Sequence, residues 1–159
     1  MLRLAPEFFN TVKQTAEHAR QHRQECRRLH AKVVRHVLLV EALLHLVLAR
    51  IALGLLPFHL YECLIRTDDT PMLGAYGMTA RAVGSAVQRI AGIVPCRSDC
   101  LIQATAAQWM LRRRKVPTRL HVGVVSANSA VNAHAWLVYD SFVITGRRGH
   151  KQFHTLRVY

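Results

Sequence analysis

The sequence predicts an α+β fold in which helices come first and a small antiparallel sheet follows. Apolar residues recur at helical spacing through the first two thirds of the chain, and after Pro117 they alternate as they do in strands. Of the 159 residues, 51% are hydrophobic, which suffices for one packed core. The 8 glycines and 5 prolines are too few for a collagen-like or low-complexity chain.

The N-terminal third is predicted to be helical throughout. Residues 1–35 hold eight of the 22 Lys and Arg residues, and we expect them to form a basic helical arm ahead of a main domain at residues 36–159. A long helix is expected from about Ala31 to Leu56, with its end marked by Pro57. Its apolar stretch, Val37 to Leu60, is interrupted by charged and polar side chains, which favours a buried core helix over a membrane span.

Two further helices are predicted before the sheet. Thr67 to Gly77 is rich in turn residues and is expected to be a loop. Thr79 is a candidate N-cap for the next helix. Ser98 is a candidate N-cap for a helix from Asp99 to Arg113, which Pro117 follows.

The last third is predicted to form the sheet. Alternating residues indicate strands at 119–125, 131–139 and 142–145, with a last strand at 153–159. Asp140 and Ser141 are expected to form a tight turn between the second and third strands.

The overall charge and cysteine content narrow the class of protein. The net charge of +13 is compatible with nucleic-acid binding, but the basic residues are scattered and no known binding motif occurs. Four cysteines are too few for a disulfide scaffold, and no secretory signal is convincing. We therefore expect a cytoplasmic protein.

Cys100 and His134 are the candidate catalytic residues. Cys100 falls in the first turn of a predicted helix, where unpaired backbone N–H groups and the helix dipole favour a reactive thiolate. His134 lies in a predicted strand, and a histidine facing such a thiol can take its proton and later give it to a leaving amine. Zinc binding by Cys96, Cys100, His121 and His134 is disfavoured by the ligand spacing, and no metal or cofactor is expected.

Several spaced motifs resemble the cysteine protease that matures lasso peptides, a transglutaminase-like enzyme. These are the segment that opens at Cys100, the basic turn from Leu111 to Pro117, the strand ending near Gly123-Val124, and the AHAW strand with His134. The resemblance covers about residues 38–158. It implies a papain-like core in which the helix of Cys100 packs on the sheet that carries His134.

The resemblance also implies a function and partners. Such an enzyme removes the leader from a ribosomally made precursor, usually after a leader residue that follows a penultimate threonine, and a cyclase of the asparagine-synthetase type then closes the macrolactam. Fused relatives carry an N-terminal leader-recognition domain of winged-helix type. Only about thirty residues precede the apolar helix here, so we expect the split form, which works with a separate recognition protein.

The third catalytic group is left open by the sequence. Many relatives have an acidic residue about twelve positions after the histidine, where this chain has Gly146. Asp140 lies in the turn, ~20 Å along the strand from His134, whereas the hairpin brings Thr145 to Arg147 opposite it. The orienting group is then the Thr145 hydroxyl, a backbone carbonyl or another group, or the site is a dyad.

The sequence also offers donors for an oxyanion hole and leaves two rival functions open. The Cys100 backbone N–H is the first oxyanion donor to consider, and Gln88 and Gln103 are candidates for a second. The rival functions are a basic nucleic-acid-binding protein and a non-catalytic adaptor that presents leader peptides. Of the three, only the protease needs the Cys100 thiolate.

Overall fold

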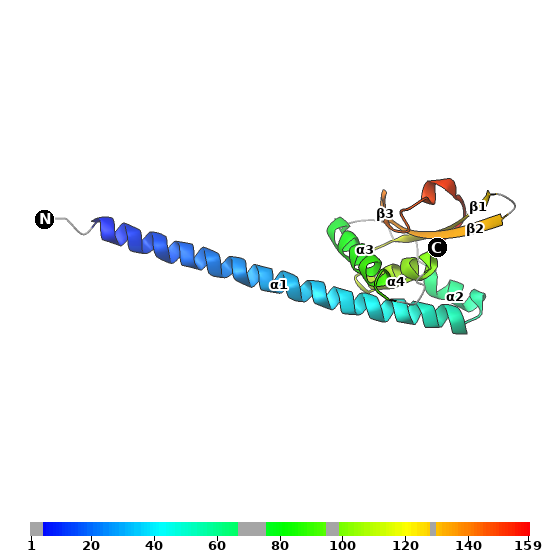
Figure 1. The fold of residues 1–159 in the computed structure, drawn as a ribbon, viewed down its shortest axis with the longest axis horizontal. Coiled ribbons are helices and arrows are strands. Elements are labelled where there is room, and N and C mark those ends of the chain that lie inside the picture. The colour runs from blue at the N-terminus through cyan, green and yellow to red at the C-terminus, as the bar shows by residue number, and fades with distance from the viewer. Residues whose placement is uncertain (1–4, 67–75, 95–98, 128–129) are drawn as a thin grey trace. The chain divides into compact units, whose positions relative to one another are not determined.

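The computed structural model describes residues 5–66, 76–94, 99–127 and 130–159, and its elements follow the predicted order of helices and then strands (Figure 1). The elements are α1 (Ala5–Leu55), α2 (Phe58–Ile65), α3 (Gly77–Ala91), α4 (Cys100–Arg113), β1 (Arg119–Ala127), β2 (Ala130–Tyr139), β3 (Phe142–Thr145), the 3₁₀ turn η1 (His150–Gln152) and β4 (His154–Val158). The α+β prediction is confirmed.

The four strands form one antiparallel sheet in the order β3-β2-β1-β4. β1 and β2 pair along their whole length, with Gly123 opposite His134. β2 turns at Asp140, which has a left-handed backbone (φ 51°), and returns as β3 with Thr145 opposite Leu137. This hairpin brings the residues after β3 alongside His134, as the sequence predicted.

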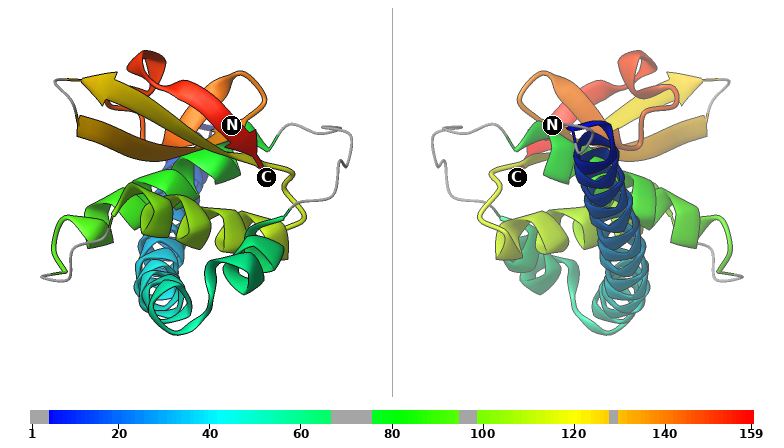
Figure 2. Two further views of the ribbon diagram at one scale, coloured as in Figure 1. Left: turned by 90° about the vertical axis from the view of Figure 1, so that its right-hand side faces the viewer. Right: turned by 90° about the vertical axis from the view of Figure 1, so that its left-hand side faces the viewer.

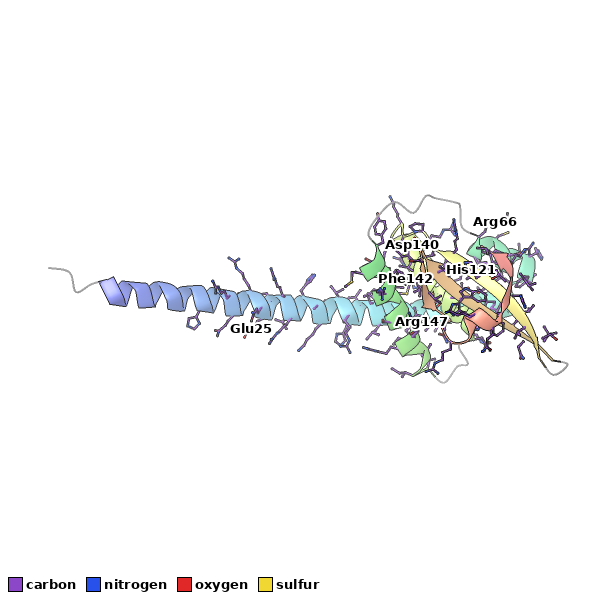
Figure 3. The ribbon with its side chains drawn as sticks, turned by 90° about the horizontal axis from the view of Figure 1, so that it is seen from above. Glu25, Arg66, His121, Asp140, Phe142 and Arg147 are labelled. Atoms are coloured by element: carbon purple, nitrogen blue, oxygen red, sulfur yellow. The ribbon has the colours of Figure 1, made fainter. Side chains whose placement is uncertain are left out.

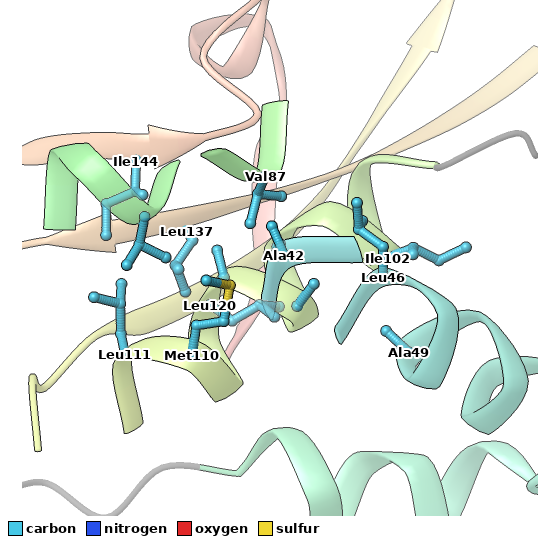
Figure 4. Packing of buried hydrophobic residues seen from close by; sticks show 14 of the residues in the cluster. Ala42, Leu46, Ala49, Val87, Ile102, Met110, Leu111, Leu120, Leu137 and Ile144 are labelled. Carbon is cyan, nitrogen blue, oxygen red and sulfur yellow. The ribbon is translucent and has the colours of Figure 1, made fainter. Parts of the chain in front are cut away.

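Helices α3 and α4 cover one face of the sheet (Figure 2). Both helices supply buried apolar residues that meet the inward side chains of the strands. Figure 4 shows this core, in which Val87 of α3 and Met110 of α4 pack with Leu120, Leu137 and Ile144 of the sheet. The close approach of α3 to β3 requires a glycine, because a Cβ on Gly84 would lie 2.6 Å from a methyl group of Ile144.

Side-chain hydrogen bonds fasten α2 and the C-terminal part of α1 to α4. The Tyr61 and Thr105 hydroxyls are 2.6 Å apart and fully buried, and the Gln108 amide donates to the Ile65 carbonyl. Glu41 of α1 accepts two bonds from the Arg114 guanidinium, at 2.9 and 2.5 Å. Polar side chains of the helices therefore hold this layer together.

The prediction that the apolar stretch of α1 is a buried core helix is only partly right. Ala42, His45, Leu46 and Ala49 are buried, but the opposite side of α1 keeps large apolar side chains exposed: Val40, Leu44, Val47, Leu48, Ile51 and Leu55. Spacing alone cannot show this, because the stretch is apolar on all sides. Over Arg20–Leu55, α1 is long and apolar enough to cross a membrane by length and composition, a test that core helices and signal sequences also pass.

The chain consists of two units by its internal contacts, with the boundary between Val37 and Leu38. The N-terminal part of α1 is therefore a unit of its own. The helix of the arm is confirmed from Ala5 onwards. In the described part of the chain, the side chains of residues 20–37 are exposed. A single helix with exposed basic side chains has no core of its own.

Neither of the two predicted N-caps occupies the cap position of its helix. Thr79 is not the N-cap of α3, because the helix begins at Gly77 and Tyr76 occupies the cap position without a side-chain bond. The Tyr76 backbone N–H donates instead to the Tyr139 hydroxyl, a tertiary bond that local sequence does not reveal. The cap position of α4 is occupied by Asp99, also without a side-chain bond, so the prediction of Ser98 as the N-cap is wrong. Ser98 itself lies outside the described residues, as do Cys96 and most of the predicted 67–77 loop.

Candidate active site

Cys100 is the first residue of α4 and lies against the strand that carries His134. Its Sγ accepts a hydrogen bond of 3.3 Å from the backbone N–H of Ala135, the residue next to His134. The thiol is partly exposed, so it can be reached by a substrate. Both the Ala135 N–H and the positive end of α4 stabilise negative charge on this sulfur.

His134 is held by the main chain of the segment that follows β3. Its Nε2 lies 2.8 Å from the Gly146 carbonyl oxygen. A carbonyl only accepts hydrogen bonds, so Nε2 carries the proton and Nδ1 of the neutral ring is left as the basic nitrogen. The group that orients the imidazole is therefore a backbone carbonyl, one of the alternatives that the sequence left open.

Gly146 is suited to this position by its lack of a side chain. Its backbone is left-handed (φ 74°), and a Cβ there would lie 2.4 Å from the Ala135 carbonyl oxygen. No side chain fits in that space without moving the main chain. The close approach of Gly146 to β2 aims its carbonyl at His134.

The two side chains that the sequence offered as orienters make no hydrogen bond to His134. Thr145 is fully buried, and its hydroxyl finds no hydrogen-bond partner among the described residues. Asp140 is exposed in the β2–β3 turn, where the Ser141 hydroxyl donates to its carboxylate at 3.2 Å. Strand alternation explains why Thr145 does not reach His134: Thr145 pairs with Leu137, and both side chains are buried in the sheet.

A groove of about 910 Å³ contains both candidate catalytic residues. One wall is α3, which lines it with Arg81, Ser85 and Gln88 at helical spacing, and the other is β3 with the segment after it. Gln88 and Gln103 both line the groove, so the structure brings the two oxyanion candidates to the same cavity as Cys100. The Gln88 amide also donates to the Ile144 carbonyl at 3.1 Å, which fixes this side chain against β3.

Two aromatic rings lie close to the His134 ring. The ring centroid of Phe153 lies 5.0 Å from that of His134, and that of Trp136 lies 6.0 Å away. Trp136 in turn stacks on His121, at 5.5 Å. Burial, assisted by the nearby Arg119, lowers the pKa of His121, so this ring is neutral at pH 7. Sequence reasoning missed the roles of Phe153 and His121, although pairing the first two strands would have placed His121 opposite Trp136.

Cys100, His121 and His134 are the described members of the possible zinc ligand set in the sequence, whose fourth member, Cys96, lies outside the described residues. Within the described part of the chain, no group of three or more His, Cys, Asp or Glu side chains could hold a metal ion. The arrangement that is present, a thiol and an imidazole in one groove, suits covalent acyl chemistry.

Comparison with known proteins identifies the superfamily. No curated protein and no solved structure is significantly similar to this chain. A protein-family model described as the transglutaminase-like superfamily matches residues 43–158, a span that includes α2 to β4 and both candidate catalytic residues. With most of its length matched, and with a cysteine at a helix start beside a histidine-bearing strand, the chain belongs to the transglutaminase-like superfamily.

Proposed function

We propose that the protein is a cysteine peptidase in which Cys100 is the nucleophile and His134 the general base and acid. The observation that carries the proposal is the 3.3 Å bond from the Ala135 N–H to the Cys100 sulfur, which ties the start of α4 to the peptide unit that follows His134. The Gly146 carbonyl leaves Nδ1 of His134 as the proton acceptor. Members of this superfamily commonly use such a thiol for peptidase or acyl-transfer chemistry.

The reaction proceeds in two halves that share these groups. His134 takes the thiol proton, Sγ bonds to the scissile carbonyl carbon, and the C–N bond breaks as the imidazolium protonates the leaving amine. Water then adds to the thioester as His134 accepts its proton, and the acid product leaves as the thiol is restored. The developing oxyanion lies near the start of α4, where the Cys100 N–H has no acceptor within the helix. Gln88 and Gln103 are the proposed second donors.

The proposed substrate is the precursor of a lasso peptide, cut at the end of its leader. The support is the order of motifs from Cys100 to the AHAW strand, together with the superfamily assignment. A small pocket near Cys100 would read the penultimate threonine of the leader. The product would pass to an asparagine-synthetase-like cyclase, and the pathway would be cytoplasmic.

A separate leader-recognition protein of winged-helix type is part of this proposal. The exposed apolar side chains of α1, from Val40 to Leu55, are the surface that we assign to it. Stable contacts between proteins bury aliphatic and aromatic anchors of this kind. The partner would hold the remote part of the leader and raise the local concentration of the scissile bond.

The test is cleavage of the precursor by variants of the two catalytic residues. In the presence of the recognition protein, Cys100→Ala and His134→Ala should each lower the cleavage rate by about a thousandfold or more, because an activated nucleophile is lost. Mass spectrometry of the peptide products measures this. Cys63→Ala removes an exposed thiol of α2 and is the matched control, expected to cleave normally.

The opposite result has a clear meaning. Full cleavage by the Cys100→Ala protein would exclude the peptidase. It would leave the chain as an adaptor or a nucleic-acid-binding protein, the two functions that need no thiolate.

A further inference from the structure

The groove that holds Cys100 and His134 is strongly basic. Arg81, Arg147 and Arg148 line it, and none of its described lining residues is acidic. None of the three guanidinium groups has a carboxylate within ion-pair distance among the residues that the structure describes, although Arg50, Arg114 and Arg157 elsewhere in the chain each do. Three unpaired positive charges on one groove favour an anionic ligand.

The three arginines occupy defined places along the groove. Arg147 and Arg148 follow directly after Gly146, whose carbonyl bonds His134. Arg81 lies seven residues before Gln88 on α3, which corresponds to ~10 Å of helix, and its guanidinium stacks 4.6 Å from the ring centroid of Phe142. Figure 3 labels Phe142 and Arg147, two of the side chains along this groove. An extended peptide covers ~10 Å with three residues.

We infer that the substrate carries acidic side chains, Asp or Glu, within about four residues of the scissile bond, and that Arg147, Arg148 and Arg81 bind them. The inference rests on the proposed peptidase function and adds the substrate's charge to it. Guanidinium groups bind carboxylates with two parallel hydrogen bonds, so they can select an acid over its amide as well as attract it. The packing of Arg81 on Phe142 fixes one of these groups in advance.

The first arm of the test measures binding without cleavage. The probes are two fluorescein-labelled twelve-residue peptides with the same Ala, Gly and Ser framework, one with two Glu residues four positions apart and one with Gln at both positions. Fluorescence anisotropy gives their dissociation constants for the Cys100→Ala protein. We expect about tenfold tighter binding of the Glu peptide in low salt, and a smaller difference at high salt.

Matched variants locate the effect. Arg147→Gln with Arg148→Gln, added to Cys100→Ala, should abolish most of the preference for Glu. Arg112→Gln with Arg113→Gln removes the same charge from the exposed last turn of α4, outside the groove, and should keep it. Equal binding of the two peptides, no binding of either, or an equal loss in both double variants would overturn the inference.

The second arm uses the wild-type protein and the precursor that it cleaves. Replacing every Asp and Glu within four residues of the cut by its amide should lower kcat/KM about tenfold or more. If kcat/KM is unchanged, the acidic-substrate inference fails while the peptidase stands. If nothing is cleaved but the Glu peptide is still preferred in the first arm, the peptidase fails while the anionic ligand stands.

Discussion

The candidate active site and the helical layer are held together by different kinds of groups. In the site, the Cys100 sulfur is bonded by a backbone N–H and the His134 ring by a backbone carbonyl. In the helical layer, hydrogen bonds between two side chains connect the helices, as in the pairs Glu41–Arg114 and Tyr61–Thr105. Apart from loss of Cys100 or His134 themselves, the site should therefore respond most to changes that move the backbone, and the layer to loss of individual side chains.

Among the changes that test this contrast, the largest effect is expected for Gly146→Asp, which places a carboxylate at this position. The added Cβ would lie 2.4 Å from the Ala135 carbonyl oxygen, so the main chain must move away from His134. We expect at least a tenfold loss of cleavage rate and a loss of stability of about 2 kcal/mol or more. Cleavage assays and thermal unfolding measure the two effects.

Gly149→Asp is the control for this substitution. Gly149 has nearly the same left-handed backbone (φ 73° against 74°), but a Cβ there meets only an edge of Phe153 at 3.9 Å. Backbone strain alone would make the two variants alike. A Gly146→Asp protein that cleaves faster than the wild type would show that a carboxylate can replace the carbonyl.

A smaller effect, on stability alone, is expected for Glu41→Gln. The bond from Arg114 lowers the pKa of Glu41, and both side chains are mostly buried, with 16% and 29% of their surface exposed. Loss of this pair should cost about 1 to 2 kcal/mol at pH 7. Urea unfolding measures the cost, and the turnover of the folded variant should not change.

The pH dependence of this pair follows from the direction of the pKa shift. Because the pKa of Glu41 is lower in the folded protein than the 4.5 of a free side chain, the stabilisation is present above pH 4.5 and is lost as the pH falls through the folded value. The difference between wild type and Glu41→Gln should therefore shrink below pH 4.5. A difference that grows on acidification would contradict this account.

The smallest effect is expected for Thr145→Val. The hydroxyl of Thr145 is buried without a hydrogen-bond partner among the described residues, so replacing it by a methyl group should change stability by less than about 1 kcal/mol and leave cleavage intact. Thr105→Val is the matched control. That hydroxyl is equally buried but bonds Tyr61, and its loss should cost about 1 to 2 kcal/mol. A large loss of activity with Thr145→Val would restore its hydroxyl as the orienter of His134.

The sequence was most informative where a periodic pattern coincided with a chemical signal. The helix of Cys100, predicted from Asp99, begins at Cys100 and ends at Arg113 as expected, because the pattern ends before Pro117. The strands follow from alternation, and the turn at Asp140 from its residue types. The start of α3 and the exposed side of α1 depend on tertiary contacts, which local patterns do not contain.

The sequence named the candidate catalytic side chains, but it left the group that orients His134 open among several alternatives. The strand pattern correctly placed the segment from Thr145 to Arg147 near His134, but it did not decide between the Thr145 hydroxyl, a backbone carbonyl and another group. The signal for the backbone was the glycine itself, since a glycine allows a close approach of the main chain that no other residue fits. The unpaired arginines were likewise visible as residues but not as neighbours in one groove.

The Gly146 carbonyl has a consequence for how this site can be mapped genetically. Every amino acid carries a backbone carbonyl, so no substitution removes the one at residue 146. An alanine scan would therefore identify Cys100 and His134 and would describe the site as a dyad. Gly146→Ala would be scored as a loss of stability, because the new methyl group clashes with the Ala135 backbone. This loss would mask any effect on the orientation of His134. Removing the acceptor itself takes an atom-level replacement, such as a thioamide at residue 146 introduced by chemical synthesis or ligation.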